Sequence, residues 1–264
     1  HDFVNWLARA EYLRRQYNDP HLDVRVVPGM RDLSDRDKQY TAERRAWRIE
    51  NLLLPLARLV PSVVSATVAQ SGEQRLTYGN PGQPMPPIFK APKLARDIVA
   101  QAFPQGDRLV TLTLRDSDFE SQRNTRHREW EKVASWLTGL DYQPVFVPDG
   151  EAVMRGKSPL LTGWPQYHPA SHTPALRLAL YEHAKINVVT NSGIMVMALY
   201  SDVPLVALRM FVPDVKACSV QHMKQSGFAP EYDWSTPAHK KSQHWEEDYA
   251  QDMVGVLKAR LLQG

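Results

Sequence analysis

The sequence has few of the features that mark several large protein classes. Of its 264 residues only Cys218 is a cysteine, which excludes an intramolecular disulfide framework and a Cys-x-x-Cys metal site. One cysteine fits a reducing compartment, so we expect a cytoplasmic protein in which Cys218 is a small buried hydrophobe. The sequence also lacks a Gly-x-Gly-x-x-Gly or Walker motif, which argues against a dinucleotide oxidoreductase or a P-loop enzyme.

Long hydrophobic runs and a strong charge bias are absent as well. The longest apolar run, residues 193–200, is far shorter than the roughly 20 residues of a membrane-spanning helix. We therefore expect no transmembrane segment, which leaves room only for peripheral membrane contact. Basic residues number 32 against 29 acidic ones, and a net charge of +3 is too small to indicate a nucleic-acid partner. With 43% hydrophobic and 23% charged residues, the composition is that of a globular protein.

Strand-like and helix-like segments alternate along most of the chain. Alternating apolar residues predict a strand at 22–26. Buried apolar or β-branched runs predict strands at 62–69, 108–114, 143–147, 186–190 and 204–208. Apolar residues at helical spacing predict helices from residue 2, over 49–60 with a kink at Pro55, and over 92–103, 125–137, 174–184, 193–201 and 245–262. Such alternation predicts an α/β fold with parallel sheets covered by helices.

The best linker candidate is the segment from Ser71 to Pro87, where three glycines and four prolines change the composition. We therefore expect two Rossmann-like doubly wound units, residues 1–88 and 89–264, that face each other across a cleft. The first unit begins with a helix, so it is either small or lacks its first strand. We expect the last helix to pack back on this first unit.

Ligands of open parallel sheets bind beyond the carboxyl ends of the strands, and the loop after strand 108–114 is rich in arginine. Arg115 leaves the strand, while Arg123 and Arg126 lie at the start of the next helix. A cation at a helix N-terminus is disfavoured by about 0.3–1 kcal/mol. Guanidinium groups there make better sense around a bound anion, because they grip phosphate bidentately. The alternative is a solvated basic face that the acidic residues of the same loop neutralise.

A second informative loop follows strand 186–190. The strand ends in Thr190, and Asn191-Ser192-Gly193 then leads directly into a helix. We expect Asn191 or Ser192 to cap that helix, while Gly193 allows close approach of a ligand to the backbone. Exposed amides at such a turn can bind an anion.

The stretch from Leu178 to Gly193 and its continuation through Leu208 resemble glycosyltransferases of the GT-B fold, particularly bacterial heptosyltransferase-like enzymes. The region from Arg123 to Trp130 is also similar to theirs, with basic residues before a tryptophan-bearing helix. In total the resemblance covers residues 108–210 and, faintly, the last helix. A second resemblance, to the strand-Arg-x-x-Asp element of GDP-fucose-dependent fucosyltransferases, is carried by residues 112–118 and also assigns Arg115 to donor phosphates.

The resemblance implies a glycosyltransferase of bacterial cell-surface glycans, with residues 89–264 binding a nucleotide-sugar co-substrate and residues 1–88 on the acceptor side. The donor diphosphate would lie against Asn191, Ser192 and Gly193, neutralised by arginines of the other loop, with no metal or other cofactor required. Direct displacement with inversion is expected, since no well-placed nucleophile is visible. The candidate general bases are Asp2, Asp116 and Asp118.

Two departures from the family pattern favour an alternative, a nucleotide-sugar-binding protein without turnover. Asn191 stands where the family commonly has Asp, and Val196 stands where it commonly has His. A third reading, a sugar-nucleotide epimerase, lacks a convincing set of acidic residues.

One further pair of aromatic side chains is a candidate for ligand contact, whereas a group of histidines is not. Trp164 and Tyr167 lie in the long proline-rich loop expected over residues 148–172 and are our acceptor-contact candidates. His168, His172 and His183 lack a carboxylate at a fixed offset, so we expect no metal site.

Overall fold

A computed structural model describes residues 2–27, 39–69, 87–156, 161, 163–225, 228 and 230–262 of the chain. The expected linker lies outside the described residues except for Pro87. The chain is a mixed α/β protein in which every strand pair is parallel, as the alternation of segments predicted.

The N-terminal part contains a two-stranded sheet of β1 (Leu22–Val26) and β2 (Val63–Val68). Its helices are α1 (Asp2–Tyr17), α3 (Ala42–Arg48) and α4 (Leu54–Ala57). A π-helical segment, Ile49–Leu53, joins α3 to α4, in which Pro55 is the second residue. Proline lacks an amide hydrogen and crowds the preceding turn, so the expected kink takes the form of this wider turn.

A five-stranded parallel sheet forms the rest of the framework, in the order β4-β3-β5-β6-β7. Its strands are β3 (Leu109–Thr113), β4 (Gln143–Val147), β5 (Ile186–Thr190), β6 (Leu205–Leu208) and β7 (Lys241–Gln243). The first four agree with the predicted strands. The short and polar β7 carries no apolar run, so the sequence pattern did not predict it.

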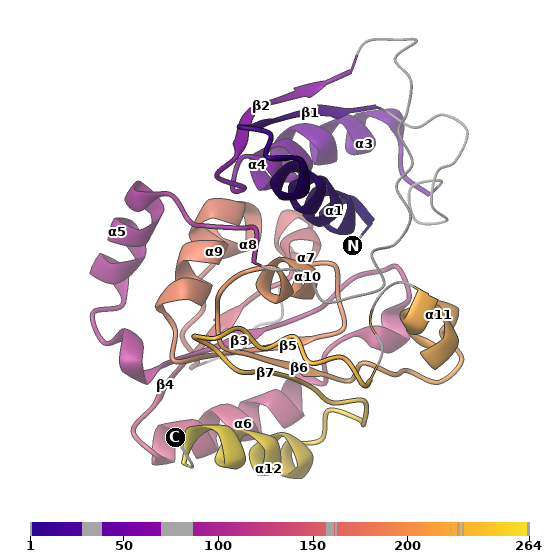
Figure 1. Cartoon of the computed structure of the whole chain (residues 1–264). Helices are drawn as coiled ribbons and strands as arrows, with labels where there is room; N and C mark the ends of the chain where they lie inside the picture. The colour runs from indigo at the N-terminus through magenta and orange to yellow at the C-terminus, as the bar shows by residue number, and fades with distance from the viewer. Residues whose placement is uncertain are drawn as a thin grey trace.

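Helices cover both faces of this sheet, as Figure 1 shows. On one side lie α6 (His127–Gly139) and α12 (Ala250–Leu261). On the other lie α9 (Pro174–His183) and α10 (Met195–Leu199), with α5 (Lys93–Ala102) beside α9. The loop expected over residues 148–172 instead contains α7 (Gly150–Met154) and α8 (Pro169–His172), and α11 (Val220–Gln225) follows β6.

Two hydrophobic clusters fill the space between these layers. The larger joins residues of the N-terminal part, such as Leu7 and Ala57, to residues of α9 and α10. The smaller lies between the sheet, α6 and α12. The last helix therefore packs on α6 rather than back on the N-terminal part, because its buried stripe of Met253, Leu257 and Leu261 belongs to the smaller cluster.

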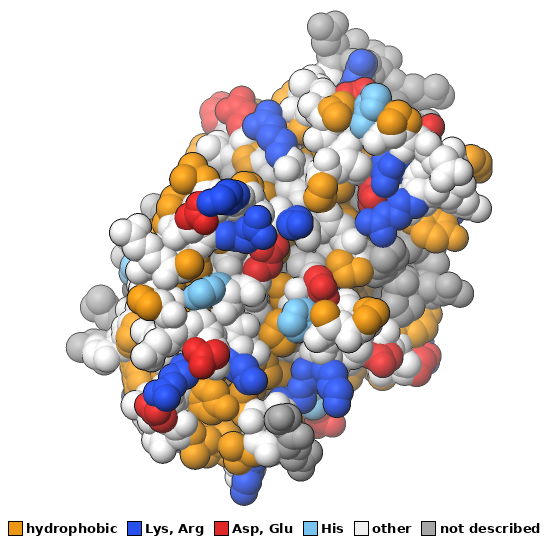
Figure 2. All heavy atoms as spheres, turned by 60° about the vertical axis from the view of Figure 1, so that its left-hand side comes forward, with side chains coloured by type: hydrophobic (Ala, Val, Ile, Leu, Met, Phe, Trp, Pro, Cys, Tyr) orange, Lys and Arg blue, Asp and Glu red, His pale blue; other side chains and the backbone are white. Residues whose placement is uncertain are grey.

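The surface carries no continuous field of one charge on the face that Figure 2 presents. Blue basic and red acidic side chains are interspersed there, with apolar side chains scattered between them. No helix in the described part of the chain is both long and apolar enough to cross a membrane.

Candidate ligand site at the carboxyl edge of the sheet

The order of strands fixes where two adjacent loops diverge. β3 pairs with β4 on one side and with β5 on the other, so the connections after β3 and β5 run to opposite faces of the sheet. Ligands of open parallel sheets bind at such a point. The two loops singled out in the sequence are the ones that leave this point.

Hydrogen bonds close the loop after β3 on itself. The Arg115 amide donates to Thr125 Oγ1 at 2.7 Å, and the Thr125 amide donates back to the Arg115 carbonyl at 2.9 Å. The Arg115 guanidinium is buried and donates to the Phe119 carbonyl, the Glu120 carbonyl and Asn124 Oδ1. Arg115 therefore stabilises the conformation of the loop in this structure, and its guanidinium is engaged by oxygens of that loop.

Arg123 joins the two loops. Its Nη2 donates to the Asn191 carbonyl at 2.8 Å, and its Nη1 pairs with a Glu120 carboxylate oxygen at 2.6 Å. The Nε atom of Arg123 is buried and has no hydrogen-bond partner within the described part of the chain. The Oγ1 atom of Thr190, the residue before Asn191, is also buried and has no hydrogen-bond partner among the described residues. Buried polar atoms without partners are uncommon and point to a missing water or ligand.

Two further residues of this edge were not singled out in the sequence. Arg209, directly after β6, donates to the carbonyl oxygens of Gln122 at 2.7 Å and Asn124 at 2.8 Å. Asp248 is fully buried and accepts from Trp130 Nε1 at 2.9 Å and Arg126 Nη1 at 3.2 Å. The position of Arg209 at the end of a strand was a usable signal. Asp248 fell within the expected last helix, which begins later than predicted.

The electrostatic balance of the edge is close to neutral. Four guanidinium groups, those of Arg115, Arg123, Arg126 and Arg209, lie among three carboxylates, those of Glu120, Glu247 and Asp248. Burial alone would lower the pKa of Arg126, but its hydrogen bond to Glu247 and the charge of Asp248 raise it above the usual value. The basic loop is thus not a solvated face, since it is folded into a network of ion pairs and carbonyl contacts.

The turn after β5 differs from expectation in its capping. The N-cap of α10 is Ile194, without a side-chain hydrogen bond, so neither Asn191 nor Ser192 caps the helix. Asn191 is buried, and its Nδ2 donates to the Met210 carbonyl at 2.9 Å because the end of β6 runs beside it. With five residues, α10 also supplies only a small helix dipole. A Cβ atom built on Gly193 would meet no atom within 4 Å, so space remains above this backbone.

The candidate bases fall in different surroundings. Asp116 is half-buried next to Arg115, and its carboxylate has no partner within the described residues. Asp118 is 74% exposed and forms an ion pair with Arg155. The side chain of Asp2 lies outside the described part of the molecule. Asp116 is therefore the candidate that the structure leaves available.

The N-terminal part reaches the same edge through Glu151 on α7. The Glu151 carboxylate accepts from the Tyr40 hydroxyl, from Arg44 Nη2 at 2.9 Å and from Ser117 Oγ at 3.0 Å. These contacts tie the start of α3 to the loop after β3. The sequence contained no signal for this pairing, because the residues are more than a hundred positions apart.

Trp164 and Tyr167 do not lie with these loops. Trp164 borders a cavity of about 440 Å³ together with Gln143 and Pro144, the first residues of β4. Tyr167 packs edge-on against Phe103, with ring centroids 5.2 Å apart. A second cavity of about 510 Å³ likewise lies at the amino edge, beside Ile186 and Pro204. Among the described residues no group of three or more His, Cys, Asp or Glu side chains could hold a metal ion.

Comparison with protein-family models and with curated proteins finds no match. A comparison with solved structures finds chains of similar fold, and two of them are described here. The E. coli ADP-heptose LPS heptosyltransferase II shares 16% identity at a TM-score of 0.44, over 66% of this chain and 53% of that one. A glycosyl transferase family 9 protein from Veillonella parvula shares 12% identity at a TM-score of 0.48, over 99% of this chain and 78% of that one.

Both of these proteins are glycosyltransferases, the class named in the sequence resemblance, and their sequence identity to this chain is low. The chain spans about half the length of the heptosyltransferase that it matches.

Proposed function

We propose that this protein is a glycosyltransferase that moves a sugar from a nucleoside-diphosphate donor to a glycan or a related acceptor. The observation that carries the proposal is the meeting of Arg123 with Asn191 at the point where the connections after β3 and β5 diverge. The unpartnered Arg123 Nε and Thr190 Oγ1 atoms at this point support a polar ligand there. The resemblance of residues 108–210 to GT-B enzymes supplies the class of that ligand.

In this proposal the donor diphosphate lies over the open backbone of Ser192 and Gly193. Arg123 offers its Nε hydrogen to a phosphate oxygen, and Arg115 keeps the neighbouring loop in shape. A guanidinium in a water-poor site stabilises the charge that builds on the departing diphosphate. Such stabilisation by side chains needs no metal ion.

The transfer step is proposed to be a direct displacement with inversion. The acceptor hydroxyl attacks the anomeric carbon as the bond to the diphosphate breaks, through a state of oxocarbenium character. Asp116 takes the proton of the attacking hydroxyl. The acceptor enters between the N-terminal part and the carboxyl edge of the larger sheet, which corresponds to the cleft of a two-unit fold.

A second candidate function is nucleotide-sugar binding without turnover. It is favoured by the Arg115 guanidinium, whose donors go to oxygens of its own loop, and by Asn191 and Val196 at positions where the family commonly has Asp and His. Both functions use the same residues at the carboxyl edge, and they differ in whether bonds are broken.

A thermal-shift screen with GDP, UDP, ADP and CMP tests the nucleotide binding that both functions share. Either function predicts that one nucleotide raises the melting temperature more than the others. Slow hydrolysis of the corresponding nucleotide sugar then supports the transferase, and its complete absence supports the binding protein. Equal response to all four nucleotides, or none, contradicts both.

A further inference from the structure

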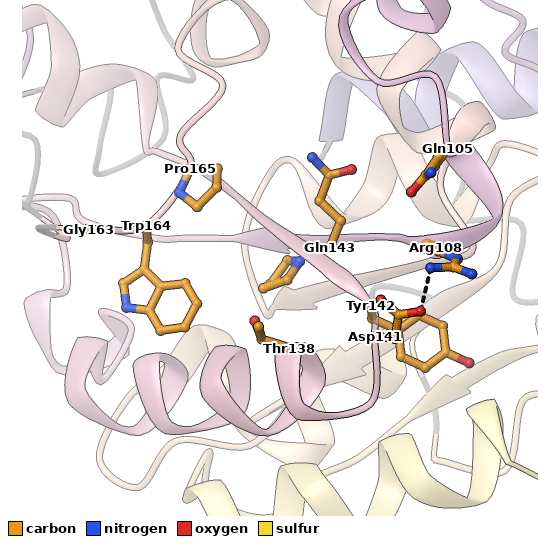
Figure 3. A pocket seen from close by; sticks show the side chains of 10 residues that line it. Gln105, Arg108, Thr138, Asp141, Tyr142, Gln143, Gly163, Trp164 and Pro165 are labelled. Carbon is orange, nitrogen blue, oxygen red and sulfur yellow. Dashed lines mark hydrogen bonds and ion pairs between the residues drawn. The ribbon is translucent and has the colours of Figure 1, made fainter.

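An open cavity at the amino edge of the larger sheet belongs to neither of the loops described above. It has a volume of about 440 Å³ and lies between the end of α6, the start of β4 and the segment around Trp164. Figure 3 shows Trp164 on one side of it and Tyr142 on the other, with Thr138 of α6 between them. Cavities of this size lie within the range that holds small ligands.

The aromatic wall of this cavity is held in place. Gly163 adopts a φ of +90°, a conformation that side-chain-bearing residues rarely take, and so turns the chain into Trp164. The Phe146 amide then donates to the Pro165 carbonyl at 2.9 Å, which fixes this segment along β4. The rings of Trp164 and Phe146 also meet edge-on, with centroids 6.3 Å apart. These contacts therefore fix the orientation of the Trp164 indole ring at the cavity.

The polar ends around the cavity are free to bind. The indole nitrogen of Trp164, the Tyr142 hydroxyl and the side-chain amides of Gln143 and Gln105 make no hydrogen bond with any described residue. Together they offer donors and acceptors around an aromatic surface. This combination suits a ligand that has both hydroxyl groups and apolar C–H faces.

The charges of the cavity cancel. Its Arg108 and Asp141 are the charged residues of the lining and form an ion pair with each other, so the lining has no net charge. The second cavity of the amino edge differs, because Lys240 and Arg260 lie there by the end of α12. Cations are favourable near a helix C-terminus and would be found there without any ligand.

We propose that the cavity lined by Trp164, Tyr142 and Gln143 binds a neutral saccharide, with a sugar ring against the indole and its hydroxyl groups on the free amides. This site is separate from the carboxyl edge, and the inference does not rest on the proposed transfer. In a transferase it would be a second point of attachment for a glycan.

Saturation-transfer difference NMR with maltotriose, cellotriose and N,N′-diacetylchitobiose tests the proposal on the full chain, with adenosine and uridine as competing probes. We expect at least one saccharide to bind saturably. Trp164→Ala should weaken this binding about tenfold or more, Trp164→Phe should retain part of it, and Gln143→Ala should weaken it as well. Trp136→Phe, an aromatic replacement on α6 outside the cavity, should leave it unchanged.

The outcomes separate this proposal from the proposed function. Saccharide binding that is absent in the wild type, or unchanged in both Trp164→Ala and Gln143→Ala, overturns the saccharide site. Binding of adenosine or uridine in place of every saccharide also overturns it. If Trp164→Ala does not fold, Gln143→Ala and Gln105→Ala decide. The saccharide site is separate from the carboxyl edge, so all these variants should show the same thermal shift with nucleoside diphosphates. A wild type that binds no nucleotide would contradict the proposed function and would leave the saccharide test unaffected.

Discussion

The Nη2 atom of Arg123 lies 2.8 Å from the carbonyl oxygen of Asn191. This contact joins the loop after β3 to the turn after β5, which are 68 positions apart in the sequence. It places a buried guanidinium beside an open stretch of backbone. The predictions about ligand binding below depend on this junction.

Arg123→Gln should weaken both the junction and the binding of the preferred nucleotide. The substitution removes the ion pair with Glu120 and the contact with Asn191, and we expect a loss of about 1–3 kcal/mol in the free energy of unfolding. Nucleotide affinity should fall about tenfold or more. Urea unfolding and isothermal titration calorimetry measure the two effects. Arg128→Gln, at an exposed position of α6, is the matched control and should change neither.

Gly193→Ala should separate ligand binding from stability. A Cβ atom at this position meets nothing within 4 Å, so the free energy of unfolding should stay within about 0.5 kcal/mol of the wild type. The methyl group would occupy the space that we assign to the diphosphate, so nucleotide affinity should fall. Gly255→Ala in α12 also has open space and should leave affinity unchanged. Unaltered titration of Gly193→Ala would remove this turn from the site.

Asp116→Asn should lower the rate of transfer or donor hydrolysis while nucleotide affinity stays the same. General-base catalysis contributes about 100-fold or more, and an amide cannot accept the proton. Steady-state rates and nucleotide titration of the same sample give the two readouts. Asp118→Asn, at a 74% exposed residue paired with Arg155, is the control. Equal rates in the wild type and in Asp116→Asn would exclude Asp116 as the base.

Lys241 should make the protein more stable in mildly alkaline solution. Its Nζ donates to the carbonyl oxygens of Leu199 and Ser201, both at 2.6 Å, and burial lowers its pKa to about 8. Between this value and the unfolded pKa of about 10.4, the unfolded chain binds more protons than the folded one. The free energy of unfolding should therefore rise by about 2–3 kcal/mol from pH 8 to pH 10.

Urea unfolding of wild type and Lys241→Met across this range checks the prediction. The variant should show no such rise. Burial raises the pKa of Tyr200 to about 12, so the contribution of Tyr200 to stability declines only above about pH 10. Tyr200 therefore does not mask the effect of Lys241 between pH 8 and pH 10. A wild-type stability that is flat or falls between pH 8 and pH 10 would contradict the lowered pKa of Lys241 in the folded protein.

Glu11 should contribute stability that is lost in acid. Burial alone would raise its pKa, but hydrogen bonds from Arg14, Ser62 and Arg15 outweigh burial and lower the pKa to about 2. The contribution is complete above the unfolded pKa of about 4.3 and disappears as the pH falls toward 2. We expect the wild type to lose about 3 kcal/mol more than Glu11→Gln between pH 5 and pH 2. If the free energy of unfolding falls equally in the wild type and in Glu11→Gln over this pH range, this role of Glu11 is contradicted.

The framework of the larger sheet could be predicted because its strands are buried on both faces. Runs rich in apolar and β-branched residues, such as Leu109–Thr113 and Ile186–Thr190, are typical of strands that helices cover on both faces. Parallel pairing then brings the loops after β3 and β5 to one edge, so their proximity was also predictable. The strand Lys241–Gln243 was missed because a short edge strand needs no apolar run.

The roles of the arginines were less predictable. A sequence shows that Arg115 follows a strand, but its acceptors are largely backbone carbonyl groups, which every residue has. Likewise nothing in the local pattern pairs Tyr40 with Glu151, since that contact depends on how the N-terminal part packs. Side-chain partners across long separations are decided by packing rather than by spacing.

A crystal structure with the preferred nucleoside diphosphate bound is the most direct test of the account. It should show the diphosphate beside Ser192 and Gly193, with a phosphate oxygen within hydrogen-bond distance of Arg123 Nε. A nucleotide bound in either cavity of the amino edge, with the junction between Arg123 and Asn191 left empty, would contradict the proposed site.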